Sequence, residues 1–101
     1  MVPLSKATQV RLNALFAASD LATASALLLE QCSENLHFGG STPEELERVR
    51  FAVLKLSQGD LGRMRDALGL AETDWRDVLV AAGFADDISA HRRWWPEGAG
   101  P

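Results

Sequence analysis

The sequence predicts an all-α fold, a compact bundle of five to six helices built from antiparallel helical hairpins. Apolar residues recur at helical spacing along the chain, and residues that favour helix starts stand in front of these segments. Very short connections follow the first and the third of these segments, and such connections favour antiparallel neighbours. No stretch of useful length alternates between apolar and polar residues, so we expect no β-sheet.

Length and composition are those of one globular domain. The 101 residues are 47% hydrophobic and 24% charged, which is ordinary for a folded domain. We expect residues 1–95 to form a single helical domain and residues 96–101 to form a flexible C-terminal tail. No apolar stretch approaches the roughly 20 residues of a membrane span, and Asp20 interrupts the segment where a secretory signal needs an apolar core.

The first two expected helices form a hairpin. Ser5 is placed to cap a helix that runs to about Ala18, and Ser19 or Asp20 is placed to cap the next. The apolar stripe of the first helix consists of Ala7, Val10, Ala14 and Ala17, with Leu12, Leu15 and Phe16 beside it. The inner face of the second carries Leu21, Ala24, Leu28 and Cys32.

The third helix has the clearest start signal in the chain. Thr42 stands at the N-cap, Pro43 at the first helical position, and Glu45 where it completes a capping box. The helix that follows is apolar on most of its sides, so we expect it at the centre of the bundle. Its inward residues are Leu46, Val49, Val53 and Leu56.

Residues 61–80 imitate a helix-turn-helix hairpin. We expect Asp60 to cap a helix that Gly69 breaks, and Thr73 to cap a second helix that ends at Gly83. A glycine in the turn with apolar residues on both sides fits the DNA-binding motif. Nucleic-acid binding through this hairpin is therefore the alternative function.

Charge argues against that alternative. The formal net charge is −4, and an acidic chain repels phosphate. The would-be recognition helix carries three carboxylates and one arginine, namely Glu72, Asp74, Asp77 and Arg76. Reading of base edges normally rests on Arg, Lys, Asn or Gln. Arg63 and Arg65, together with Arg48 or Arg50, could still form a small basic patch.

Nothing in the sequence demands enzyme, metal or cofactor chemistry. Cys32 lies on an apolar stripe, which indicates a buried structural thiol, and His37 stands in a loop. His91 lies beside Arg92 and Arg93, which disfavour a general base at neutral pH. The spacing of histidine and cysteine fits no metal site, and no phosphate-binding loop is present.

The C-terminal segment carries the positive indication of function. We expect a last helix from Asp86 or Asp87 to about Trp95, with Ile88 and Trp95 closing the bundle and Trp94 exposed. Tryptophan and arginine are enriched at protein–protein contacts. The candidate partner-binding residues are Trp94, Trp95, Arg92, Arg93 and, in the glycine-containing loop, Phe38.

Together these features predict a non-enzymatic protein–protein interaction module. Its partner would be another protein, or a second copy of the chain bound through the C-terminal aromatic segment. The single cysteine suits a reducing compartment, which favours the cytoplasm. The abundance of alanine, and of arginine over lysine, is typical of GC-rich coding and favours a bacterial source.

Overall fold

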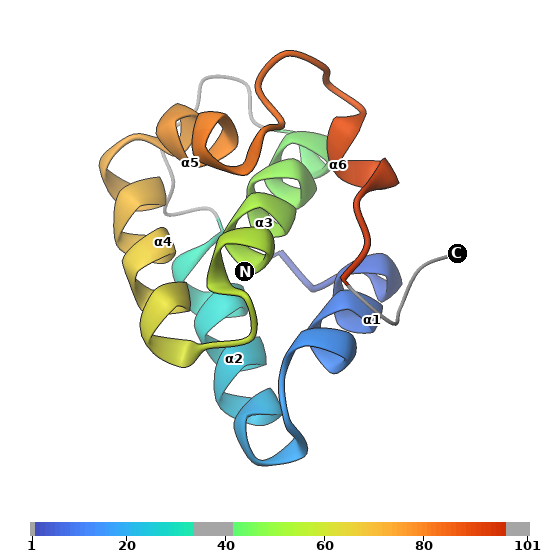
Figure 1. Ribbon diagram of the computed structural model, residues 1–101, viewed down its shortest axis with the longest axis vertical. Helices are drawn as coiled ribbons and strands as arrows, with labels where there is room; N and C mark the ends of the chain where they lie inside the picture. The colour runs from blue at the N-terminus through green and yellow to red at the C-terminus, as the bar shows by residue number, and fades with distance from the viewer. Residues whose placement is uncertain (1, 34–41, 97–101) are drawn as a thin grey trace.

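The computed structural model describes residues 2–33 and 42–96, and these ranges contain six helices and no strand. The helices are α1 (Lys6–Leu15), α2 (Ala18–Gln31), α3 (Pro43–Ser57), α4 (Leu61–Thr73), α5 (Trp75–Ala82) and α6 (Ala90–Arg93). Figure 1 shows α3 between α1 and α6 on one side and α4 and α5 on the other. The predicted all-α bundle is confirmed.

Helix α3 is central because apolar residues surround most of its circumference. Its buried residues are Leu46, Val49, Arg50, Phe51, Ala52, Val53, Leu54 and Ser57. The predicted start is confirmed, since the Thr42 side-chain oxygen accepts a hydrogen bond of 3.2 Å from the Glu45 amide. The helix ends at Gln58 and Gly59, which both have positive φ. A Cβ atom at Gly59 would lie 2.3 Å from the Leu15 carbonyl oxygen, so this close approach requires glycine.

The predicted stripe of α1 is wrong, although its cap at Ser5 is confirmed by a hydrogen bond from the Thr8 amide. Thr8, Arg11 and Leu12 are buried, whereas Val10 of the predicted stripe is 38% exposed. The large side chains of Leu12 and Phe16 decide which face packs inward, and Thr8 and Arg11 lie on that face. Alanine contributes too little apolar area to compete.

Helix α2 begins slightly earlier than predicted. Its N-cap is Ala17, which makes no side-chain capping bond, so the expected caps Ser19 and Asp20 lie inside the helix. The predicted inner face is otherwise confirmed: Ala24, Leu28 and Cys32 are buried, and Leu21 packs against the core.

The prediction that Gly69 breaks a helix is wrong. Helix α4 runs through Gly69 to Thr73, and a Cβ atom at Gly69 would meet nothing within 4 Å. A solvent-facing glycine costs a helix only about 1 kcal/mol, and the buried Leu68 and Ala71 anchor the chain on either side. The connection is Asp74, which replaces the expected Thr73 as the cap of α5 and accepts from the Arg76 amide at 3.0 Å.

The predicted end of α5 is confirmed, whereas the predicted extent of α6 is wrong. Gly83 ends α5 in the left-handed conformation, as expected. Helix α6 is much shorter than predicted: it spans only Ala90–Arg93, with Ser89 at its N-cap. In the part of the chain that the structure describes, no helix has both the length and the apolar character needed to cross a membrane.

Candidate functional site

The C-terminal segment is held against α1 by a buried arginine. Arg11 is 1% exposed, and its Nε and Nη2 atoms donate to the Trp94 carbonyl oxygen at 3.2 and 2.9 Å. Nη2 also donates to the Arg92 carbonyl oxygen at 3.4 Å, and Nη1 donates to the Ala7 carbonyl oxygen at 3.0 Å. We call residues 90–96 the C-terminal strap and Arg11 its clamp.

Aromatic rings enclose the guanidinium of the clamp. The Arg11 Cζ atom lies 4.1 Å from the Phe51 ring centroid and 3.9 Å from the Trp95 ring centroid. Such cation–π contacts stabilise a charge that has left water. Burial lowers the pKa of Arg11, and the Glu47 carboxylate partly offsets this effect. The guanidinium remains charged, because arginine does not lose its proton in proteins.

The predicted partner-binding residues divide into two groups. Trp94 is half-buried and packs against the core, and Trp95 is half-buried over Arg11, so the expected exposure of Trp94 is wrong. Arg92 and Arg93 are exposed. The fifth predicted residue, Phe38, lies outside the described residues.

Ile88 does not close the bundle as expected. Its side chain is 80% exposed, the largest exposure among the large hydrophobic residues of the described ranges. The reason is that the chain before α6 is not helical, so Ile88 does not share a helix face with Trp95. Instead, the Asp87 carboxylate accepts from the Ser89 amide at 2.9 Å and pairs with Arg93 at 2.6 Å. These bonds hold the Asp87 pKa well below its usual range, Arg93 contributing most.

A pocket of about 320 Å³ lies beside Ile88, between the start of α3 and the approach to α6. Its lining residues, which we call the α3–α6 surface, are Thr42, Glu44, Glu45, Arg48, Ile88, Ser89 and Arg92. The Arg48 Nη2 atom donates to the carbonyl oxygens of Phe84 and Ala85, which fixes one wall of the pocket. The surface therefore combines an exposed aliphatic side chain with charges of both signs.

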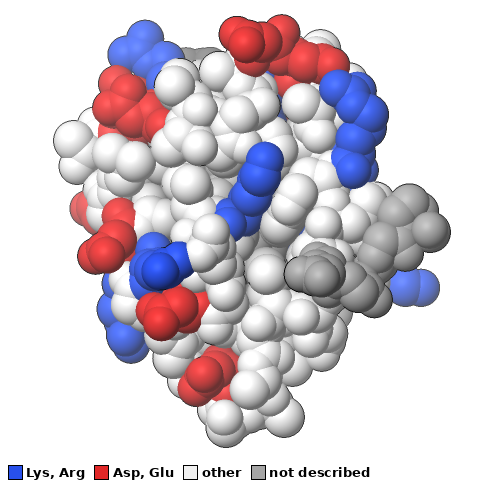
Figure 2. Space-filling model, in the orientation of Figure 1, with Lys and Arg blue, Asp and Glu red and all other residues white. Residues whose placement is uncertain are grey.

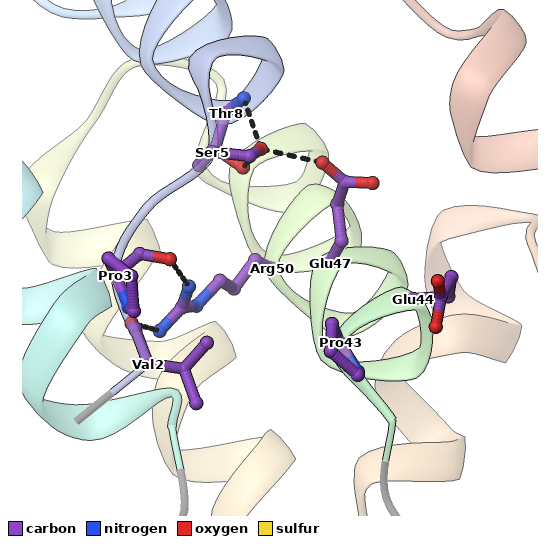
Figure 3. Close-up of a pocket in the computed structure, with 8 residues that line it drawn as sticks. All are labelled: Val2, Pro3, Ser5, Thr8, Pro43, Glu44, Glu47 and Arg50. Atoms are coloured by element: carbon purple, nitrogen blue, oxygen red, sulfur yellow. Dashed lines mark hydrogen bonds between the residues drawn. The ribbon is translucent and has the colours of Figure 1, made fainter.

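A second pocket, of about 210 Å³, lies where the N-terminal segment crosses α3 (Figure 3). There the Ser5 hydroxyl donates to the Glu47 carboxylate at 2.6 Å. Arg50 donates to the carbonyl oxygens of Pro3 at 3.0 Å and Val2 at 2.7 Å, and both bonds are drawn in Figure 3. These polar groups serve to hold the N-terminal segment on α3, so we assign this pocket a structural role.

Among the described residues, Cys32 and His91 form no nucleophile–base pair, because neither ring nitrogen of His91 has a hydrogen-bond partner. Burial raises the pKa of the Cys32 thiol to about 12, so the nucleophilic thiolate is absent at neutral pH. His91 is buried among aromatic rings, and His37 lies outside the described residues. Within residues 2–33 and 42–96, no three potential metal ligands come together.

The hairpin at residues 61–80 lacks the turn that suggested a DNA reader. Gly69 is inside α4, and a single residue, Asp74, joins α4 to α5. Arg50 is buried, and Arg48 is bonded to backbone carbonyl groups, so neither extends a patch around Arg63. On the face shown in Figure 2, basic and acidic side chains lie side by side rather than in regions of one sign.

Comparison with known proteins identifies no relative. No protein-family model matches the chain, and no curated protein or solved structure matches it significantly.

Proposed function

We propose that the chain is a non-enzymatic interaction module that binds another protein at the α3–α6 surface. The observation that carries the proposal is Ile88, which stands 80% exposed at the edge of the 320 Å³ pocket. Covering such a side chain stabilises a complex by roughly 1.5–3 kcal/mol. A single exposed aliphatic residue is common on proteins, and Ile88 differs from Val80, which is 65% exposed, because Ile88 lines the α3–α6 pocket and Val80 does not.

The charges of the surface indicate the chemistry of the partner. Glu44 and Glu45 stand in the first turn of α3, and Arg92 stands across the pocket on α6. We infer an amphipathic segment that covers Ile88 with an apolar side chain, places a basic group near the two glutamates and an acidic group near Arg92. Charge complementarity of this kind contributes more to specificity than to affinity.

The tryptophans have a supporting role in this proposal. Trp94 packs against the core and Trp95 covers Arg11, so in this proposal they hold the strap that carries Arg92 and do not insert into a partner. Arg93 is already paired with Asp87, and an exposed pair of this kind offers little binding energy. Of the residues that the sequence put forward, Arg92 is therefore the one we retain as a direct contact.

The test compares two exposed aliphatic positions. Ile88→Ser should weaken partner binding by about tenfold or more, because the aliphatic contact is lost, whereas Val80→Ser should leave binding unchanged. A photoreactive amino acid in place of Ile88 should cross-link the protein whose binding Ile88→Ser weakens, and one in place of Val80 should not. Equal loss of binding in both variants, or equal cross-linking at both positions, would contradict the proposal.

The nucleic-acid alternative is tested by a gel shift with the same protein. A gel shift at low salt that weakens when Arg63 and Arg65 are replaced by alanine would favour it over protein binding. We expect no shift, because the hairpin carries carboxylates beside its arginines and the chain is acidic.

A further inference from the structure

The C-terminal strap contains a histidine whose polar atoms are unsatisfied. His91 is 1% exposed, and among the described residues neither of its ring nitrogens has a hydrogen-bond partner. The Phe51 ring packs against it at a centroid distance of 5.3 Å, and the Phe84 ring lies at 6.3 Å. A neutral imidazole tolerates such a site at some cost, whereas an imidazolium would bring two N–H donors and a charge into it.

The charged groups around His91 also oppose its protonation. Arg11 faces it from α1, Arg48 from α3, and Arg92 from its own helix. Among the described residues, the one carboxylate that favours the charged form is Glu47 of α3, which already accepts a hydrogen bond from Ser5. The pKa of His91 is therefore lowered from 6.5. Burial is the main cause, and the charge of Arg92 is the second.

The strap is attached by the hydrogen bonds of Arg11 and by apolar contacts, among them the packing of Ala90 and Trp94 against the core. Arg11 binds the carbonyl oxygens of Arg92 and Trp94, Trp95 covers Arg11, and His91 fills the space between Phe51 and Phe84. Helix α6 itself has only four residues, too few to be stable without these contacts. Because α3, α4 and α5 also pack directly on one another, release of the strap would leave the contacts among these three helices in place.

We propose that His91 makes the strap a pH-sensitive closure, which is seated at neutral pH and released by mild acid. The released segment exposes His91 to water, where it takes up a proton that the seated state excludes. Release would uncover Arg11 and Phe51 and free Trp94 and Trp95. This inference does not depend on the proposed partner.

The direction of the effect follows from linkage. The seated state has the lower histidine pKa, so its stability is full above the ordinary pKa of 6.5 and is lost as the pH falls below that value. Between 6.5 and the pKa of the seated state, the ratio of released to seated molecules rises by up to about tenfold per pH unit. Below the pKa of the seated state, the ratio becomes constant.

The experiment uses the full chain labelled with 5-fluorotryptophan and follows its three tryptophans by fluorine NMR from pH 7.5 to pH 5. The resonances of Trp94 and Trp95 should move towards the position of exposed tryptophan, while that of Trp75 on α5 should stay. His91→Phe should abolish the movement, and His37→Gln, which removes the other histidine, should retain it. If His91→Phe does not fold, His91→Gln serves as the variant that cannot titrate.

Three results would overturn the proposal. The first is no movement of the Trp94 and Trp95 resonances down to pH 5. The second is the same movement in a folded variant without His91. The third is movement of Trp75 together with Trp94 and Trp95, because that would be unfolding of the whole bundle.

Discussion

Two buried arginines hold the two ends of the described chain, and they do so in different surroundings. Arg50 fixes the N-terminal segment through the carbonyl oxygens of Val2 and Pro3 and joins it to the end of α2 through the Cys32 carbonyl oxygen. Arg11 fixes the C-terminal strap through the Trp94 carbonyl oxygen, between aromatic rings. Backbone carbonyl groups satisfy both guanidinium groups, which keeps the buried charges tolerable.

The difference between the two clamps lies in their neighbours. Beside Arg50, the Cys32 thiol has its pKa raised to about 12 by burial, so it stays neutral throughout the physiological pH range. Within the strap held by Arg11, His91 is a group that ordinarily titrates just below neutrality. The attachment of the N-terminal segment by Arg50 is therefore insensitive to pH, whereas the proposed closure of the strap held by Arg11 depends on pH.

The largest expected effect comes from removing the N-terminal clamp. Arg50→Met should lower the free energy of unfolding by about 3 kcal/mol, because several buried acceptors lose their donor at once. Chemical denaturation at pH 7.5 measures this value. Arg65→Met, at an exposed position on α4, is the matched control and should change the stability by less than about 0.5 kcal/mol. A loss of stability in Arg50→Met as small as that in the control would contradict the role of Arg50 as a clamp.

Removing the C-terminal clamp should have a smaller and more local effect. Arg11→Met should cost about 2 kcal/mol, because the strap loses its charged donor but keeps the apolar contact of Trp94 with the core. The strap should also respond less to pH, because in Arg11→Met it is already released in more of the molecules at neutral pH. Denaturation and fluorine NMR of the same variant measure the two quantities. Full retention of the pH response would separate Arg11 from the closure.

The smallest effect is a gain in stability at a site remote from both clamps. Gly69→Ala should stabilise the chain by about 0.5–1 kcal/mol, because alanine favours a helix interior and its Cβ would meet no other atom. This value gives the background against which the two clamps are compared. A loss of stability would mean that Gly69 sits in a turn, as the sequence suggested.

Local signals explain what could be predicted from the sequence. The caps at Ser5, Thr42 and Asp60 and the end at Gly83 depend on a few neighbouring residues, and all four are confirmed. The burial of Arg11 could not be predicted, because its main acceptor, the Trp94 carbonyl group, lies 83 positions away. Gly69 was misjudged because packing on both sides outweighs its weak intrinsic preference.

The candidate site shows the same limit. Exposed arginines at 92 and 93 fit the composition of the segment, but the expected helix face placed Ile88 inside and Trp94 outside. That face required a regular helix from Asp86 or Asp87 onwards, whereas the bonds of Asp87 to Ser89 and Arg93 shape a turn there. Because α6 begins later than predicted, Ile88 is exposed instead of buried, and Trp94 is half-buried instead of exposed.

Native-state hydrogen exchange of two backbone amides tests the contrast between the bundle and its closure most directly. The Trp94 amide reports on the strap, where it donates to the His91 carbonyl oxygen, and the Val53 amide reports on the centre of α3. After correction for intrinsic exchange, the protection of Trp94 should fall between pH 7.5 and pH 5.5 while that of Val53 holds, and His91→Phe should remove the fall. A parallel loss of protection at both amides, or an unchanged fall in His91→Phe, would contradict the account.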